Sequence, residues 1–189
     1  MKNICILLSV ILFRSTTPAP TIDKVEEKKA FELLNKIRVN PAAYHSAYHF
    51  SLTEIKARPK LKWNETLAKV AEQKALDMAK RNYFEHVDPD GYGMNYYMNK
   101  GGYTLDPDLL TDKKANYFES IEAGSATGEL AIKDLIIDAG VPSLGHRYHL
   151  LGVGEWNESL VDIGIGFVRS TGKTDYITYV SVLIATHEP

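Results

Sequence analysis

Two β-rich runs late in the chain constrain its fold more than any other feature of the 189 residues. Residues 161–168 and 176–185 are rich in Ile, Val and Tyr, and Thr171-Gly172-Lys173 between them suits a hairpin turn. The patterns that precede them are mainly helical, and strands and helices do not alternate regularly. This order predicts an α+β domain and argues against a doubly wound parallel sheet.

The strongest helical pattern lies between Asn64 and Asn82. Asn64 is a suitable N-cap, and the residues after it place apolar side chains on one face at helical spacing: Leu67, Val70, Ala71, Ala75, Met78 and Ala79. The helix is expected to end near Asn82, directly before Tyr83-Phe84-Glu85-His86. A long, rigid helix therefore leads into the loop that presents His86.

Weaker patterns predict the remaining elements. A first helix is expected over residues 21–39, with Thr21 or Asp23 as its cap, and Pro41 suits the first position of a short second helix. Three further segments complete the prediction: short helices over 93–100 and 129–138, and a strand over 117–121.

The first residues have the layout of a secretory signal peptide. Lys2 precedes an apolar run over residues 4–13, which is too short for a bilayer span of roughly 20 residues. Small residues follow, and Thr17 is the preferred cleavage position. We expect a signal peptide over residues 1–17 and one domain over 18–189, with no transmembrane segment once the leader is removed. An uncleaved membrane anchor is the alternative.

Charge and cysteine content exclude several function classes. The formal net charge is −2, and loss of Lys2 and Arg14 with the leader makes it more negative, so a nucleic-acid partner is not expected. The single cysteine, Cys5, also lies in the leader. The exported domain would then have neither thiol catalysis nor a zinc–thiolate site, and core burial alone would stabilise it.

The loop that begins at His86 resembles a calcium loop only superficially. An EF-hand needs Asp at its first position and a bidentate Glu at its twelfth, where this chain has His86 and Tyr97. The loop His86-Val-Asp88-Pro-Asp90-Gly91 retains strong turn chemistry. A lone histidine there is more often structural than functional.

A second histidine motif is Gly145-His146-Arg147-Tyr148-His149. His146 and His149 are spaced i, i+3, which suits a metal pair on one helical face, but the HExxH signature is absent. Together, His86 and His146 would supply two imidazoles, and Glu119 one carboxylate, for a zinc site with an open fourth position. The sequence itself does not establish that these side chains meet.

Taken in order, five segments resemble the CAP superfamily of cysteine-rich secretory proteins, antigen 5 and pathogenesis-related proteins, also called SCP/TAPS. Three of them are Tyr83-Phe84-Glu85-His86 after its helix, Glu119-Ser-Ile-x-x-Gly124, and Gly145-His146-Arg147 followed by Leu150-Leu151, and it is the five in this order that are specific. The others are the stretches over 34–41 and 161–166. The last histidine motif is similar to that of bacterial members, so a single bacterial-type CAP domain is expected over 18–189.

The resemblance implies a three-layer α-β-α sandwich with a central, mainly antiparallel sheet. It also implies a cleft of two histidines and two acidic residues that coordinates a divalent cation, Zn, Mg or Ca. His86, Glu119 and His146 match the family positions. The usual context of the fourth residue is missing, and Asp138 is the nearest candidate, with Asp134 and Glu129 behind it.

The resemblance also frames three functional hypotheses. The preferred one is a secreted or periplasmic module whose cleft binds a small ligand or a cation, with a lipid, a sterol or an envelope or host component as partner. The second is a metal-dependent hydrolase or peptidase in which Glu119 acts as a base toward a metal-bound water. The third is a purely structural or interaction module of the cell envelope.

Overall fold

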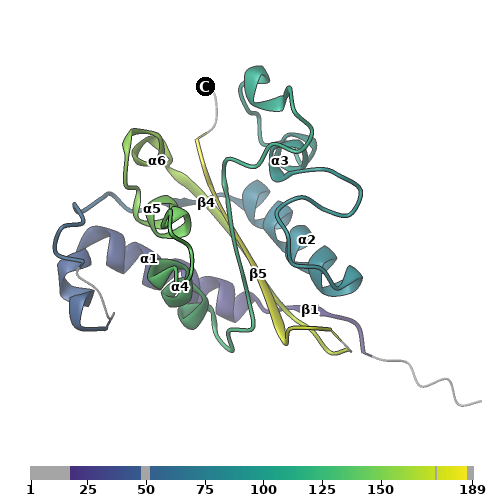
Figure 1. Ribbon diagram of the computed structural model, residues 1–189, viewed down its shortest axis with the longest axis horizontal. Coiled ribbons are helices and arrows are strands. Elements are labelled where there is room, and N and C mark those ends of the chain that lie inside the picture. The colour runs from purple at the N-terminus through teal and green to yellow at the C-terminus, as the bar shows by residue number, and fades with distance from the viewer. Residues whose placement is uncertain (1–17, 48–51, 173, 187–189) are drawn as a thin grey trace, which may run out of the picture.

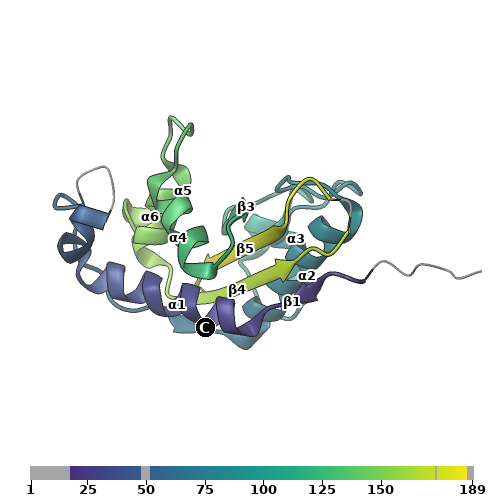
Figure 2. The ribbon, with the colours of Figure 1, turned by 90° about the horizontal axis from the view of Figure 1, so that it is seen from below.

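The computed structural model describes residues 18–47, 52–172 and 174–186. These residues form three layers, in which a sheet lies between two groups of helices (Figures 1 and 2). The predicted signal peptide over residues 1–17 lies outside the described residues. Within the described part of the chain, no helix has the length and apolar character needed to cross a membrane.

The two predicted strands are confirmed and form the centre of the sheet, whereas Lys173 of the predicted turn lies outside the described residues. Strands β4 (Asp162–Arg169) and β5 (Thr178–Ala185) pair antiparallel along their whole lengths. On the far side of β5, strand β3 (Glu119–Ala123) pairs antiparallel with it, Glu119 opposite Leu183. The outer edge of β4 pairs with β1 (Thr21–Ile22) at one end and, in parallel, with β2 (Lys62–Trp63) at the other.

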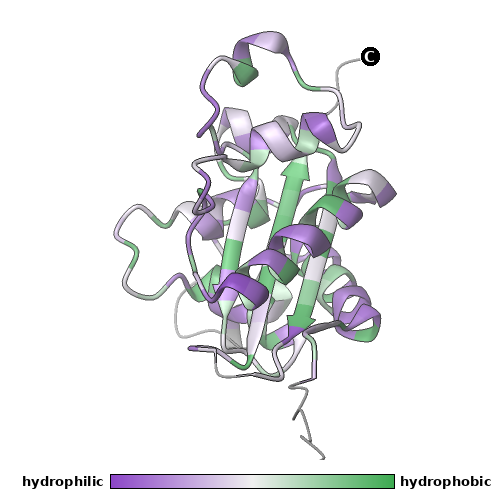
Figure 3. Ribbon diagram, turned by 90° about the vertical axis from the view of Figure 1, so that its right-hand side faces the viewer, coloured by the Kyte–Doolittle hydropathy of each residue, from purple (hydrophilic) through white to green (hydrophobic). Residues whose placement is uncertain are grey.

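One face of the sheet is covered by α2 (Glu65–Arg81), which packs against β4 and β5. Asn64 caps the helix as predicted, because its side chain accepts from the backbone N–H groups of Thr66 and Leu67. In Figure 3, α2 lies in front of the hydrophobic strands, with polar residues on its viewer-facing side. Helix α3 (Met94–Lys100) packs beside α2 in the same layer.

The close approach of α2 to the sheet depends on two glycines of β4. A Cβ atom at Gly164 would lie 2.2 Å from the backbone nitrogen of Ala68, and one at Gly166 would lie 2.4 Å from the carbonyl carbon of Ala71. No side chain fits at either position unless the backbones move apart. These glycines therefore allow the short distance between α2 and the sheet.

The opposite face of the sheet is covered by α1 (Lys24–Val39), α4 (Gly128–Ile137) and α5 (Gly145–Leu151). Helix α6 (Glu155–Ser159) extends this layer beside α5, as Figure 2 shows. Two 3₁₀ helices complete the chain, η1 (Pro41–Ala47) and η2 (Pro107–Leu110). The three-layer sandwich expected from the resemblance is confirmed.

The structure shifts several predicted boundaries. The first helix does not begin at Thr21, because Thr21 and Ile22 pair with β4 and Asp23 then caps α1. The strand predicted over 117–121 is displaced by two residues, and Tyr117 is exposed before it begins. Helix α4 ends one residue before Asp138, which adopts the left-handed conformation with a φ of 54°.

Candidate functional site

His86 is held by a carboxylate from the sheet. The chain leaves α2 through Asn82, whose φ of 51° is left-handed, and turns back toward β3. The Nδ1 atom of His86 then lies 3.0 Å from Oε2 of Glu119. The other Glu119 oxygen, Oε1, accepts a hydrogen bond of 2.9 Å from Ser181 of β5. The Glu119 side chain is fully buried, so its position is fixed by the sheet.

His146 has an equivalent partner between two helices. Asp138 ends α4, and its Oδ1 lies 2.7 Å from Nδ1 of His146 in the first turn of α5. Its Oδ2 accepts from the backbone N–H groups of His146 and Arg147, at 3.0 and 3.2 Å. The Arg147 side chain donates to the carbonyls of Ile136 and Ile137 at the end of α4. These contacts join the two helices around the His146 ring.

The two histidine–carboxylate pairs lie beside each other. The ring centroids of His86 and His146 are 6.3 Å apart, and their planes differ by 32°. We use the name histidine cleft for the group of four side chains His86, Glu119, Asp138 and His146. The structure brings all four predicted residues together, although they come from four separate segments of the chain.

The hydrogen bonds determine which edge of each ring is available. A carboxylate accepts hydrogen bonds, so in the neutral form of each ring Nδ1 carries the proton and Nε2 keeps a lone pair. No described residue hydrogen-bonds to Nε2 of His86 or His146. The side chains are 39% and 25% exposed, so solvent reaches them. The cleft therefore presents two accessible imidazole nitrogens.

The residues that could ligate a cation here are the two imidazoles, because the carboxylates lie behind the rings at Nδ1. Among the residues that the structure describes, no group of three or more His, Cys, Asp or Glu is arranged to hold a metal ion directly. A tetrahedral zinc ion bound to both Nε2 atoms would bring the ring centroids to ~5 Å. The rings would then have to approach by about 1 Å from their observed separation.

His149 does not belong to the cleft, which corrects the idea of an i, i+3 metal pair with His146. It is buried, its Nδ1 accepts a 2.8 Å hydrogen bond from Ser120, and its Nε2 donates to the carbonyl of Ile184. Burial lowers the pKa of His149 to about 4, so the ring is neutral near pH 7. Its role is to join α5 to the sheet.

The other acidic candidates lie elsewhere. Asp134 accepts a hydrogen bond from the hydroxyl of Ser125, and Glu129 is exposed in the first turn of α4. The sequence reasoning missed Ser181, which orients Glu119. The one signal for it is a hydroxyl between Val180 and Val182 in an otherwise apolar run, where burial requires a hydrogen-bond partner.

The model of the CAP family, described as the Cysteine-rich secretory protein family, matches residues 31–183. The chain belongs to the CAP family. The match spans both histidines and both carboxylates of the cleft, and the predicted CAP domain is confirmed.

A curated relative is the uncharacterized protein YkwD of Bacillus subtilis (strain 168), with 32% identity over 156 residues. The alignment covers 82% of this chain and 48% of YkwD, so the chain spans about half the length of that relative. This likeness supports a CAP domain of the bacterial type.

Two solved structures have the same fold. An extracellular protein containing an SCP domain from Bacillus anthracis str. Ames is 23% identical with a TM-score of 0.52, over 86% of this chain and 41% of that one. An outer surface protein from Borrelia burgdorferi is 16% identical with a TM-score of 0.53, over 89% of this chain and 100% of that one. At these identities the likeness concerns the CAP fold alone.

Proposed function

We propose that this CAP domain is an exported binding module whose histidine cleft holds a divalent cation through His86 and His146. The observation that carries the proposal is the pair of accessible Nε2 edges, each on a ring whose Nδ1 is anchored by a carboxylate. Histidines that ligate metals usually donate their other N–H to a carboxylate or carbonyl in this way. Such an arrangement fixes the tautomer and the direction of both rings.

Zinc is the cation that this donor set favours. Imidazole nitrogen suits zinc, whereas Mg²⁺ and Ca²⁺ prefer oxygen ligands. Glu119 and Asp138 would act from behind the rings by orienting them and raising their basicity. With two protein ligands, the remaining positions are left for water or for a ligand. That ligand is expected to be a lipid, a sterol or a component of the envelope or host.

The cleft gives less support to the hydrolase hypothesis. A bound zinc ion can lower the pKa of its water to about 7, but hydrolysis also needs a base that reaches that water. Both oxygens of Glu119 are already engaged, by His86 and Ser181. Glu119 is therefore better placed to orient His86 than to accept a proton from a water in the cleft.

Export is part of the proposal. The leader pattern over residues 1–17 supports it, and two proteins with this fold are described as an extracellular protein and an outer surface protein. A secreted or periplasmic location would place the cleft where envelope molecules reach it. Expression with and without residues 1–17, followed by fractionation, tests this point.

Calorimetric titration with Zn²⁺ tests the cation site. We expect binding near one ion per chain, and at least tenfold weaker binding in His86→Ala and His146→Ala. His45→Ala is the matched control, because His45 is exposed on η1, away from the cleft, and its loss should leave the affinity unchanged. Absence of binding to the unmodified protein, or equal affinity in all four proteins, would overturn the proposal.

A further inference from the structure

A buried lysine lies beneath the loop that carries His86. Lys74 is in the middle of α2 and is only 5% exposed, although lysine is rarely buried unless its charge is satisfied. No carboxylate among the described residues lies within ion-pair distance of its Nζ. The buried ammonium is therefore not part of a salt bridge, and its partners must be sought elsewhere.

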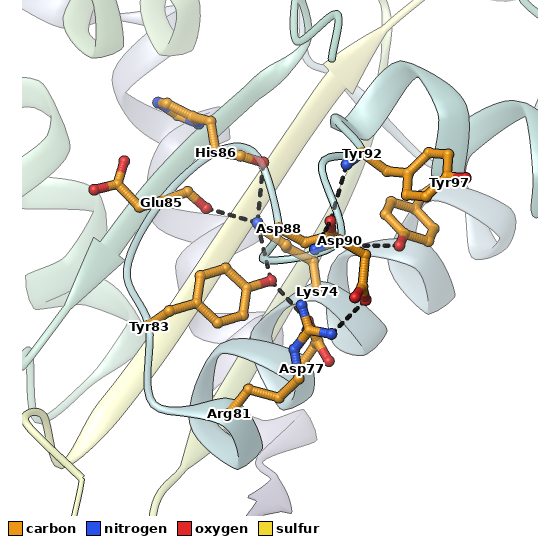
Figure 4. A network of polar contacts seen from close by, with 10 residues as sticks. All are labelled: Lys74, Asp77, Arg81, Tyr83, Glu85, His86, Asp88, Asp90, Tyr92 and Tyr97. Carbon is orange, nitrogen blue, oxygen red and sulfur yellow. Dashed lines mark hydrogen bonds and ion pairs between the residues drawn. The ribbon is translucent and has the colours of Figure 1, made fainter. Parts of the chain in front are cut away.

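The partners of Lys74 are uncharged oxygens of the following loop. Its Nζ donates to the carbonyl of Glu85 at 2.6 Å, to the carbonyl of His86 at 3.0 Å and to the hydroxyl of Tyr83 at 3.3 Å. An ammonium has three hydrogens, so these contacts use its full donor capacity. Figure 4 shows the three oxygens converging on the one nitrogen.

The loop has few other constraints at this point. Before it, Tyr83 donates to Asp77 at 2.7 Å, and after it Asp88 accepts from the backbone of Asp90 and Tyr92. Between these turns, Lys74 is the only described partner of the two carbonyls at residues 85 and 86. The two carbonyls are thus held by a single side chain, while the His86 ring itself is held by Glu119.

Lys74 acts on His86 without touching its ring. In Figure 4 the His86 carbonyl points toward Lys74, whereas the ring points away from it. The lysine also borders a cavity of about 200 Å³ between α2, the loop and α3, on the side away from the ring. It is therefore not a ligand for an ion in the cleft, and its influence passes through the backbone.

We infer that Lys74 is a positioning residue of the histidine cleft, whose ammonium fixes the His86 backbone and thereby the placement of the His86 ring beside that of His146. The expected effect of Lys74 on zinc affinity rests on the proposed cation site. The expected effect of Lys74 on the position of the His86 ring does not depend on a bound ion.

The test compares Lys74→Met with the unmodified protein. Methionine keeps the apolar stem and removes the three donors, and the adjacent cavity gives water access to the released carbonyls. We expect zinc affinity to fall about tenfold, since removal of an outer-shell partner typically costs 10–100-fold. In the metal-free protein, the ¹⁵N ring signals of His86 should shift while those of His149 stay in place. Lys80→Met, an exposed lysine of the same helix, is the control that should change neither.

Chemical rescue separates positioning from folding. Lys74→Cys, in a Cys5→Ser background so that it carries the only thiol, is alkylated in denaturant with 2-bromoethylamine and refolded. The resulting aminoethylcysteine replaces the ammonium and should restore both the ring signals and the affinity. If the unmodified protein binds no zinc but the ring signals still respond, the cation proposal fails and the role of Lys74 stands. Unchanged ring signals in folded Lys74→Met, or no recovery on aminoethylation, would overturn the role of Lys74.

Discussion

The two carboxylates of the cleft are held in different ways. Glu119 sits on the sheet and is fixed by Ser181, whereas Asp138 is fixed by the first backbone N–H groups of α5. Asp138 therefore has two tasks. It ends α4 in a left-handed conformation, and it holds the His146 ring at the start of α5.

The two tasks of Asp138 can be separated by substitution. Asparagine tolerates the left-handed conformation and can accept from the backbone, so Asp138→Asn should lose at most about 1 kcal/mol of unfolding free energy. Alanine does neither, and Asp138→Ala should lose about 2 kcal/mol or more. Urea unfolding measures both values. Equal losses would show that the backbone contacts of Asp138 contribute little.

The Asp138→Asn substitution should also change the tautomer of the His146 ring. The amide nitrogen of Asn can donate to Nδ1, which would then lose its proton and transfer it to Nε2. We expect the ¹⁵N ring shifts of His146 to report this exchange in Asp138→Asn, together with weaker zinc binding. Preservation of the original tautomer in a folded variant would contradict this account of the pair.

Among the elements, α2 and β4 have the most demanding contact. Replacing Gly166 with alanine would place Cβ 2.4 Å from the backbone of Ala71, which no side-chain movement relieves. We expect Gly166→Ala to cost about 3 kcal/mol or more in a urea titration. Gly172→Ala is the control, because nothing lies within 4 Å of its Cβ position. A loss below about 1 kcal/mol for Gly166→Ala would show that α2 can move away from the sheet at little cost.

The elements that were predicted well are those that local signals define. The cap at Asn64 and the apolar face after it predict α2 almost to the residue, and the β-rich runs predict β4 and β5. Strands β1 and β2 were missed, because each has two residues and exists only through its pairing with β4. Short strands of this kind depend on tertiary contact and carry no local pattern.

The candidate site shows a similar division. Resemblance to family motifs predicts His86, Glu119 and His146, and the position ahead of His146 predicts Asp138. No spacing rule brings residues 86, 119 and 146 together. Lys74 was missed, because a lysine in an amphipathic helix is normally exposed. Only the loop folding back over α2 buries it. The roles of Lys74 and Ser181 thus depend on contacts that the sequence pattern does not contain.

At the scale of the whole molecule, the buried groups Glu27 and His149 have pKa values shifted in opposite directions. Burial and the nearby Glu72 raise the pKa of Glu27 from 4.5 to about 7, while burial lowers that of His149 from 6.5 to about 4. Between pH 4.5 and 7 the folded state keeps a proton on Glu27 that the unfolded state loses, so stability falls as pH rises. Between pH 4 and 6.5 the unfolded state holds a proton on His149 that the folded state lacks, so stability rises.

From pH 4.5 to 6.5, the contributions of Glu27 and His149 to the pH dependence of the unfolding free energy oppose each other. In Glu27→Gln the Glu27 contribution is removed and that of His149 is kept, so unfolding free energy should rise more steeply with pH than in the unmodified protein. The difference across the window should be on the order of 3 kcal/mol. His149→Asn should have the opposite effect and make stability fall with pH. Urea midpoints at several pH values measure both, and parallel curves for all three proteins would contradict the assignment.

The position of the central hairpin has a consequence for how the chain is made. Strands β4 and β5 follow every described helix in the sequence, yet the helices on both faces pack against them. During synthesis, α1 and α2 emerge before the hairpin strands against which they pack. Their contacts with the hairpin span long stretches of sequence, which makes such contacts slow to form. A nascent chain that stops before Asp162 thus exposes both helical layers to chaperones and proteases. The core of the domain forms only when the last strands have been synthesised.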